Sequence, residues 1–369
     1  MILSNVRWKK GIPFVIGVIT VLVAVSVVCC KKSVEPGIYH GLHYTGEGMR
    51  HWYEDEGGFM DITGIPYQEL DCKSCHVKSC DACHNEMNPD KISKDTITRA
   101  RKMEVCLKCH SREKVTMKLG KVHDTLDVHF ASGMGCVDCH DVNDIHGRGK
   151  DYHSMRDRGA VSTRCVECHR YERGTFAKTK SHLIHDDRLS CEACHVQNTV
   201  TCSNCHFNNF LKTGKRKGSF IPPAMKWLLL INYDDGETSQ VTTGNVQTLV
   251  YGDKKFISYV PYYTHAINRE GRKCEDCHGN EAIQKIGRGE KIDMIWMDDG
   301  EIKHWEGVVP VVDHDRLHWT FFDLVDGKWV PLEDYRDDVT VQYAGHGSPL
   351  TARQLESLSK TFKSSDEKQ

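Results

Sequence analysis

The sequence predicts a fold of three parts: one N-terminal transmembrane helix, a central part with short α-helices and low secondary-structure content, and a β-rich C-terminal region. Three observations lead to this fold class. Residues 11–30 carry no charge, the motif Cys-x-x-Cys-His occurs eight times between residues 72 and 278, and strand-like apolar segments follow residue 216.

The uncharged run of residues 11–30 is twenty residues long. As a helix, such a run crosses the hydrocarbon layer of about 30 Å. Its length favours an uncleaved anchor over a signal segment, although Ala24-Val25-Ser26 offers a cleavage site with small residues. The sequence therefore predicts a membrane anchor in residues 1–32.

The central part is defined by its cysteines, because sixteen of the 18 belong to Cys-x-x-Cys-His motifs. Zinc sites and disulfide frameworks also use closely spaced cysteines, but neither needs a histidine directly after the second cysteine. Haem c attachment does, because the two thiols form thioethers with the porphyrin and the histidine binds its iron. The sequence therefore predicts eight haem c groups, each with one iron ion.

The predicted attachment cysteines are Cys72, Cys75, Cys80, Cys83, Cys106, Cys109, Cys136, Cys139, Cys165, Cys168, Cys191, Cys194, Cys202, Cys205, Cys274 and Cys277. The predicted proximal iron ligands are His76, His84, His110, His140, His169, His195, His206 and His278.

The first seven motifs occupy only 135 residues, from 72 to 206. A stretch so poor in long apolar runs cannot bury itself by aliphatic packing, so the haems are expected to form its core. This part is therefore predicted to be haem-packed. Only three residues separate the first two motifs, and three extended residues span about 10 Å. The first two haems are thus expected to lie almost in contact, as are the haems of the sixth and seventh motifs.

Fourteen histidines remain outside the motifs, more than the eight needed for a second axial ligand on every iron. For each of them, a surface or hydrogen-bonded histidine is the alternative interpretation. The predicted distal ligands are His43, His51, His123, His129, His146, His153, His182, His185 and His265.

The C-terminal part has strand candidates at residues 227–233, 247–251 and 256–263, and hairpin signals at Asp299-Gly300 and Asp326-Gly327. The predicted domain boundaries follow from these patterns. They are an anchor at 1–32, an N-terminal segment at 33–71, a heptahaem domain at 72–215, a β-rich region with the eighth haem site at 216–345, and a polar tail at 346–369.

Charge and cofactor type suggest a location and a class of partner. The formal net charge of −2 is too balanced to indicate a nucleic-acid partner. Haem c is attached outside the cytoplasm in known families, so the haem domain is expected on the extracytoplasmic side, periplasmic or at the cell surface, tethered to the cytoplasmic membrane. Redox proteins, either a quinol-oxidising membrane module or other cytochromes, are the expected partners, and the chain could form oligomers.

The eight motifs, the phrase GMGCVDCHDVNDIHG at 133–147 and the close pair CEACHVQNTVTCSNCHF at 191–207 resemble multihaem c-type cytochromes. The resemblance is to the group that contains octahaem tetrathionate reductase and is related to hydroxylamine oxidoreductase, and it covers about residues 70–280. It implies stacked and perpendicular haem pairs, with one open or lysine-ligated haem that converts nitrogen or sulfur oxyanions. The chain departs from related enzymes because it has no Cys-x-x-Cys-Lys motif and no cysteine outside both the motifs and the apolar run.

Two functions are compatible with these observations. The first is an electron-carrying octahaem cytochrome whose irons mostly have two histidine ligands. The alternative is an octahaem oxidoreductase of the tetrathionate, nitrite or hydroxylamine type, with one open or lysine-ligated catalytic haem and a small-molecule substrate. The number of spare histidines favours the first function, and the resemblance supports the second.

Overall fold

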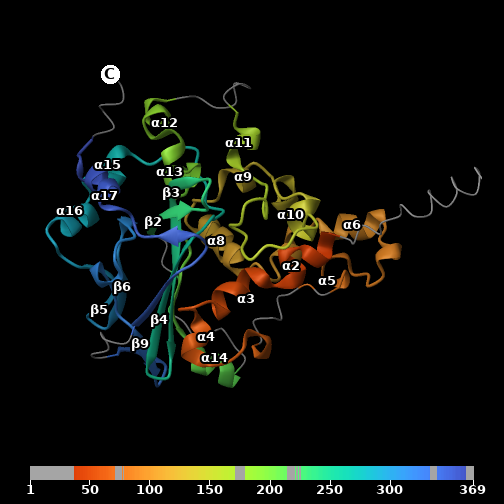
Figure 1. The fold of residues 1–369 in the computed structure, drawn as a ribbon, viewed down its shortest axis with the longest axis horizontal. Helices are drawn as coiled ribbons and strands as arrows, with labels where there is room; N and C mark the ends of the chain where they lie inside the picture. Colours follow the sequence, from red (N-terminus) through yellow and green to blue (C-terminus); the bar gives the residue numbers. More distant parts are fainter. Residues whose placement is uncertain are drawn as a thin grey trace, which may run out of the picture.

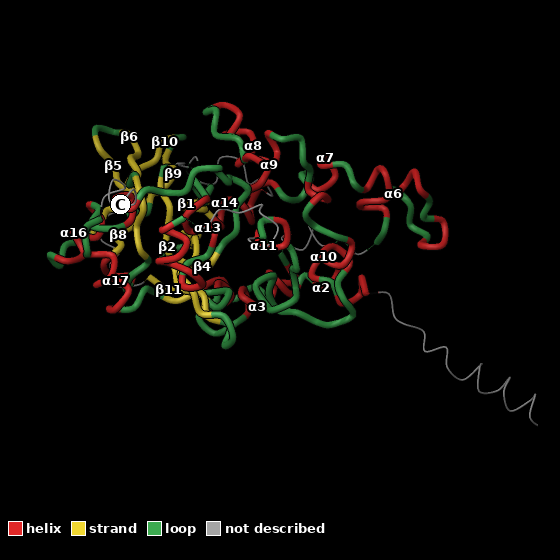
Figure 2. Tube along the Cα trace, turned by 90° about the horizontal axis from the view of Figure 1, so that it is seen from above, coloured by secondary structure: helices red, strands yellow, loops and turns green. Residues whose placement is uncertain are grey.

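The computed structural model describes residues 37–70, 77, 79–170, 179–213, 221, 223, 226–332 and 339–362. In this part of the chain, short helices and a large β-sheet lie side by side along the longest axis of the molecule (Figure 1). Seen from above, the strands gather towards one end and the short helices extend to the other (Figure 2).

The α-helices are α2 (Leu42–Thr45), α3 (Glu47–Glu54), α4 (Phe59–Thr63), α5 (Asp81–His84), α6 (Lys94–Ala100), α7 (Met103–Cys106), α8 (Ser111–Val122), α9 (Val128–Ala131), α10 (Val142–His146), α11 (Cys165–Cys168), α12 (Lys180–His185), α13 (Cys191–His195), α14 (Phe207–Thr213), α15 (Cys274–Cys277), α16 (Glu281–Gly287) and α17 (Ala352–Ser359). The 3₁₀ turns include η1 (Gly37–His40), η2 (Tyr67–Glu69), η4 (Pro89–Lys91), η5 (Cys136–Asp138), η7 (Asp186–Arg188) and η8 (His314–Arg316).

The strands are β1 (Cys202–His206), β2 (Trp227–Asp234), β3 (Ser239–Tyr251), β4 (Lys254–Pro261), β5 (Ile292–Asp298), β6 (Glu301–His304), β7 (Gly307–Pro310), β8 (Leu317–Trp319), β9 (Phe322–Val325), β10 (Lys328–Pro331), β11 (Val339–Tyr343) and β12 (Gly347–Ser348). The hairpins predicted at Asp299-Gly300 and Asp326-Gly327 are present as β5–β6 and β9–β10.

The predicted fold class and location need correction. None of the described helices has the length and apolar character needed to cross a membrane. The run of residues 11–30, on which the transmembrane prediction was based, lies outside the described residues. The expectation of low secondary-structure content in the central part is also wrong, because this part has many short helices and its strand β1 belongs to the large sheet of a mixed helix and sheet fold.

Among the described residues, the largest sheet has seven strands, in the order β11-β4-β3-β2-β12, with β1 paired to β3 and β7 to β2. The thirteen-residue strand β3 is its centre: its first half pairs with β2, and its second half pairs with β4 and with β1. Since β1 contains the seventh motif, one predicted haem site is built into the sheet.

Strand β2 is buried on both faces of the sheet, as expected for an internal strand covered on both sides. Trp227, Leu229 and Ile231 belong to the larger apolar cluster of the sheet. Leu228 and Leu230 alternate with them and pack in another cluster with residues of α13, which carries the sixth motif. The sheet therefore packs directly against a predicted haem site.

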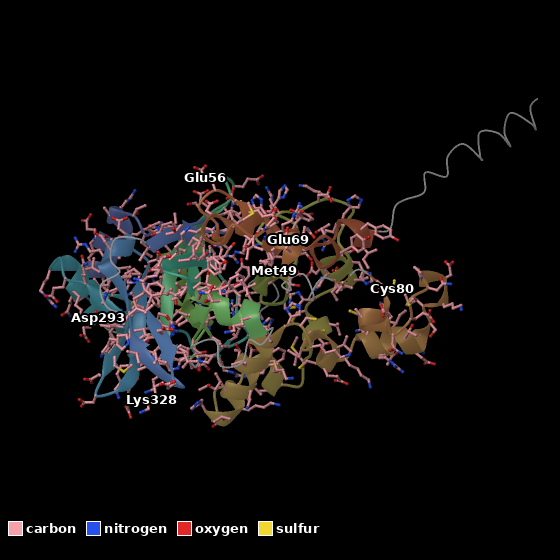
Figure 3. The ribbon with its side chains drawn as sticks, turned by 90° about the horizontal axis from the view of Figure 1, so that it is seen from below. Met49, Glu56, Glu69, Cys80, Asp293 and Lys328 are labelled. Carbon is pink, nitrogen blue, oxygen red and sulfur yellow. The ribbon has the colours of Figure 1, made fainter. Side chains whose placement is uncertain are left out.

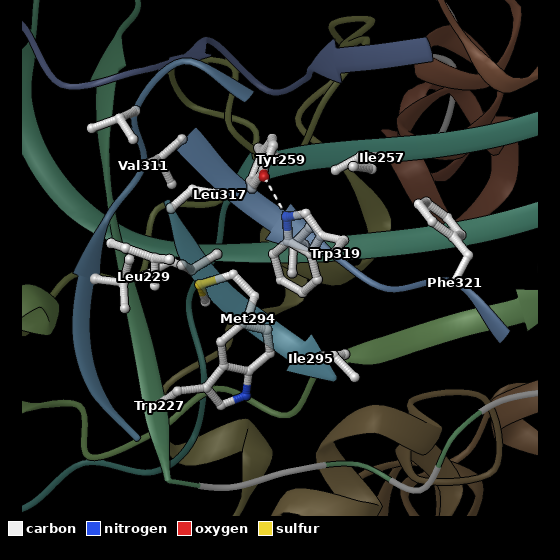
Figure 4. Packing of buried hydrophobic residues seen from close by; sticks show 14 of the residues in the cluster. Trp227, Leu229, Ile257, Tyr259, Met294, Ile295, Val311, Leu317, Trp319 and Phe321 are labelled. Atoms are coloured by element: carbon white, nitrogen blue, oxygen red, sulfur yellow. Dashed lines mark hydrogen bonds between the residues drawn. The ribbon is translucent and has the colours of Figure 1, made fainter. Parts of the chain in front are cut away.

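The larger cluster is a conventional aliphatic and aromatic core between β2–β4 and the later strands (Figure 4). Trp319 is 6% exposed and Tyr259 is fully buried, and the indole Nε1 donates a hydrogen bond of 2.8 Å to the Tyr259 hydroxyl oxygen. A buried polar pair of this kind stabilises the fold only while both partners are present.

Trp319→Phe should lower the free energy of unfolding by about 2–4 kcal/mol, because it removes this donor and leaves a small cavity. Chemical unfolding of the haem-loaded protein, followed by far-ultraviolet circular dichroism, measures the change. Tyr259→Phe and the double variant complete a cycle, and a coupling energy of about 0.5–1.5 kcal/mol is expected. Strictly additive effects would show that the hydrogen bond contributes nothing.

Candidate haem-binding sites

Six of the motifs lie in short helical turns: α5, α7, η5, α11, α13 and α15 each contain or adjoin one. In five of them the histidine N–H donates to the carbonyl oxygen of the first cysteine, four residues earlier; the donors are His84, His110, His140, His169 and His278. Residues i, i+3 and i+4 share one face of such a turn. Both thiols and the imidazole can therefore reach a single porphyrin.

The seventh motif is different because it lies in a strand. In β1, Cys202 and Cys205 pair with β3, and Asn204 between them has a positive φ of 53°. The Asn204 side chain both donates to the carbonyl oxygen of Phe322 and accepts from its N–H, at 2.7 and 2.8 Å. Pairing with the sheet thus replaces the helical turn.

Among the described residues, six proximal histidines each face a second histidine. The ring centroids are separated by 6.0 Å for His110–His43, 6.1 Å for His84–His146, 6.0 Å for His169–His129, 6.3 Å for His140–His265, 6.2 Å for His195–His182 and 6.2 Å for His278–His185. Two imidazoles on opposite sides of one metal ion, each bonded at about 2.0–2.1 Å, have their centroids about 6 Å apart. The pairs therefore fit two axial ligands of one iron.

The second ring nitrogen of most paired histidines has an acceptor beside it. Nδ1 lies 3.0–3.1 Å from a backbone carbonyl oxygen in His43 (Ile145), His185 (Ser181), His195 (Asn268) and His278 (Ser357). Ligating histidines commonly donate this N–H to a carbonyl or carboxylate, which leaves Nε2 for the metal. The hydrogen bonds are an independent sign that these rings are oriented as ligands.

Burial also prepares several rings for metal binding. It is the first cause of a lowered pKa at His43, His110, His146 and His278. A lowered pKa keeps the imidazole neutral at neutral pH, and only the neutral ring has a lone pair for iron.

At two sites, the acceptor beside the second ring nitrogen is a carboxylate and not a backbone carbonyl. At the fourth motif, Glu113 Oε2 lies 2.7 Å from His265 Nδ1 and Asp144 Oδ2 lies 3.4 Å from His140 Nδ1. At the fifth, Asp127 Oδ1 lies 3.0 Å from His129 Nδ1, and the Asp127 side chain is only 3% exposed.

The carboxylates of Glu113 and Asp144 are held in the ionised form. Burial raises the pKa of Glu113, but hydrogen bonds from His265 and Tyr262 outweigh it, and the pKa lies below the usual value. Burial likewise opposes ionisation of Asp144, yet donors from Ser162, Thr163 and Arg148 lower its pKa to about 2. Two negative charges therefore flank the His140–His265 pair.

The attachment thiols show that consecutive motifs are neighbours in space. Interaction between the two thiols lowers the pKa of Cys106 and raises that of Cys136, and in the same way lowers the pKa of Cys191 and raises that of Cys165. After burial, the thiol of an adjacent motif further raises the pKa of three cysteines: Cys83 beside Cys106, Cys139 beside Cys168, and Cys277 beside Cys194. The second, third, fourth, fifth, sixth and eighth motifs thus follow one another in an unbroken series.

The remaining predicted ligands do not form such pairs in the described structure. The rings of His51 and His153 lie 4.9 Å apart, too close for an iron between them, and His123 is exposed at the end of α8 with no histidine ring beside it among the described residues. The first motif, with the attachment cysteines Cys72 and Cys75 and the proximal ligand His76, lies outside the described residues. The His206 side chain of the seventh motif also lies outside them.

The structure gives no sign that a haem iron is bound by any of five described lysines that precede the fourth motif. Lys91, Lys94, Lys114, Lys118 and Lys121 are all exposed. By contrast, Glu113 was not recognised in the sequence, and 152 positions separate it from His265. Asp127 and Asp144 had a local signal, because each lies two to four residues from a candidate ligand.

A hollow of about 330 Å³ opens beside the second motif. Cys83 lines it together with Arg99, Lys102 and Lys108, and Asp81 and Glu104 add two carboxylates. The excess of cations suits the two carboxylate groups that every haem carries. The pairs of motif cysteines, the paired histidines and this lining all fit haem c.

The chain is similar to two curated proteins. It is 23% identical over 181 residues to the multiheme cytochrome MtrA of Shewanella baltica (strain OS185), covering 44% of this chain and 50% of that protein. It is 21% identical over 172 residues to the dissimilatory sulfite reductase MccA of Wolinella succinogenes, covering 38% of this chain and 24% of that protein. The chain thus spans half of the first relative and about a quarter of the second.

No known family profile matches the chain, and no solved structure is similar to it. The similarity to MtrA and MccA supports a multihaem c-type cytochrome. The narrower resemblance to the octahaem tetrathionate reductase group stays a prediction.

Glu113→Gln should raise the reduction potential of one haem while leaving its iron six-coordinate, because the variant keeps an acceptor for His265 and removes a negative charge. Spectroelectrochemical titration of the haem-loaded protein measures the potential. Glu290→Gln is the matched control, since Glu290 is exposed and contacts Arg288. If the two variants titrate alike, Glu113 does not act on a haem.

Proposed function

We propose that this multihaem c-type cytochrome is an electron carrier with eight haems, which transfers electrons between redox partner proteins along a series of closely spaced sites. The observation that carries the proposal is the combination of six paired histidine sites with thiol contacts between consecutive motifs. When bound, haem iron supplies the one-electron chemistry.

The chain's own residues set the spacing of the sites. The motif helices α5, α11, α13 and α15 succeed one another along the long axis of the molecule (Figure 1). Cys80 of the second motif lies towards the end of the molecule opposite Asp293 and Lys328 of the sheet region (Figure 3). A series that crosses the molecule in this way could receive an electron at one end and release it at the other.

The closed coordination of the sites is the second argument. An iron with histidine on both faces has no position for a substrate, so six of the proposed sites can exchange electrons but cannot bind a small molecule. Histidine on both faces also favours low reduction potentials, because methionine is the axial ligand that raises them. A low-potential carrier fits partner cytochromes, and MtrA is itself named a multiheme cytochrome.

An oxidoreductase with one open haem is the second candidate. The relative MccA is named a dissimilatory sulfite reductase, and the described structure assigns no distal ligand to the first or seventh motif. An open iron at either motif would give the chain a reaction centre fed by the other haems.

Electron paramagnetic resonance of the oxidised, haem-loaded protein, with carbon monoxide added to a reduced sample, tests the proposal. Haem quantification should give eight haems per chain, all low-spin, with no carbon monoxide binding. A high-spin fraction near one haem in eight that binds carbon monoxide would establish the oxidoreductase instead.

His146→Ala should convert one haem in eight to a high-spin, carbon monoxide-binding form, because it removes the ring that faces His84. The same two spectra measure the change. His318→Ala is the matched control: His318 lies in β8, is not among the predicted ligands, and has its Nδ1 2.7 Å from Asp293 Oδ1, so this variant should leave both spectra unchanged. A His146→Ala spectrum identical to that of the parent protein would refute the His84–His146 pair.

A further inference from the structure

Arg156 is a buried cation without an anion. Arg156 is only 4% exposed to solvent. Its side-chain nitrogens Nε, Nη1 and Nη2 are all buried, and none makes a hydrogen bond of acceptable geometry. Among the described residues, no carboxylate lies within ion-pair distance of it. A guanidinium carries five N–H donors, and burying such a charge without a partner is strongly unfavourable.

The structure nevertheless holds this side chain in one place. The guanidinium carbon lies 3.8 Å from the ring centroid of Tyr263 and 4.7 Å from that of Tyr233. The backbone of Arg156 is also held. The Tyr233 hydroxyl donates to the Arg156 backbone carbonyl oxygen over 2.7 Å, and the Arg156 backbone N–H donates to the Ser154 hydroxyl over 3.0 Å. Aromatic faces stabilise a cation but offer its N–H groups no acceptor in the ring plane. The donors are therefore positioned and left unsatisfied.

Arg156 interacts electrostatically with a residue of the sixth motif. Glu192, between the two cysteines of the sixth motif, is close enough to raise the pKa of Arg156, although burial and the two tyrosines have larger effects. Glu192 Oε1 is also 3.9 Å from the Cys165 thiol of the fifth motif. Through Glu192, the charge of Arg156 is thus coupled electrostatically to the region where the fifth and sixth motifs meet.

We propose that Arg156 is a binding site for one oxyanion, of the carboxylate type, where its guanidinium is held between Tyr233 and Tyr263. A planar guanidinium matches the two oxygens of such a group in a bidentate hydrogen bond, which an isolated lysine ammonium cannot reproduce. Two sources carry this chemistry: a propionate of a bound haem, or a small free oxyanion such as nitrite or sulfite. The proposal rests on haem binding by the fifth and sixth motifs but not on whether the protein is a carrier or an enzyme.

Arg156→Met in the full-length, haem-loaded protein tests the site, because methionine keeps an unbranched chain without charge or donors. Arg158→Met is the matched control: Arg158 is two residues away, exposed, and paired with Glu237 at the surface. Arg156→Lys is the second variant, which keeps the charge and the packing if Arg156→Met does not fold. The readouts are the reduction potentials and calorimetric titration with nitrite and with sulfite.

A haem propionate as ligand predicts that Arg156→Met lowers the potential of one or two haems, because an uncompensated carboxylate favours ferric iron. Arg156→Lys should lower it less, Arg158→Met should not, and the parent protein should bind neither free anion. A free oxyanion as ligand predicts binding to the parent protein that weakens about tenfold or more in both Arg156 variants.

The proposal is overturned if the Arg156 variants match Arg158→Met in both readouts, because Arg156 would then only stack on Tyr233 and Tyr263. This outcome differs from failure of the electron-carrier function. An open, high-spin iron in the parent protein would contradict the electron-carrier function. Unchanged reduction potentials and unchanged anion binding in the Arg156 variants would contradict the Arg156 site.

Discussion

The described structure brings together six pairs of imidazole rings whose centroids are 6.0–6.3 Å apart, a spacing that fits one iron ion between the two rings of each pair. His43 comes from the N-terminal helices and faces His110, while His265, in the loop after β4, faces His140. These partners are far apart in the sequence, so each proposed iron would join two segments that have little other reason to meet. Ligation of this kind couples metal binding to folding, because the ligand set exists only in the folded chain.

The sheet and the haem sites support each other. Leu228 and Leu230 of β2 pack with Ala193 and Val196 around the sixth motif, and β1 builds the seventh motif into the sheet. At the other side, the last helix, α17, places the Ser357 carbonyl oxygen 3.1 Å from His278 Nδ1. Hydrophobic burial in the sheet thus sets the positions of ligands that short helical turns alone could not orient.

The charges around the paired histidines are unevenly distributed. Carboxylates of Glu113, Asp127 and Asp144 accompany the fourth and fifth sites, whereas backbone carbonyls accompany His43, His185, His195 and His278. A carboxylate carries a full charge and strengthens the donor character of the ligand more than a carbonyl does. The middle of the series is therefore expected to have lower potentials than its ends, and Arg156 adds a positive charge close to that region.

The sequence by itself determined the attachment chemistry. In six of the motifs a cysteine, a second cysteine three residues on and a histidine directly after it lie in or beside a short helical turn, whose local geometry brings them to one face without a partner from elsewhere. The strand candidates and the two hairpins were also readable, because turn residues and apolar alternation are local signals. The transmembrane prediction, which rested on the length and apolar character of residues 11–30, is not supported, because no described helix is long and apolar enough to cross a membrane.

Only the tertiary structure decided which histidine faces which motif. His129 and His169 are 40 positions apart and His140 and His265 are 125, and nothing in the sequence matches them, because the pairing follows from how the sheet and helices pack. The same holds for Glu113 beside His265, for the strand conformation of the seventh motif, and for the burial of Arg156 between two tyrosines. Local spacing specifies a turn, whereas these contacts arise from long-range burial that has no periodic signal in the chain.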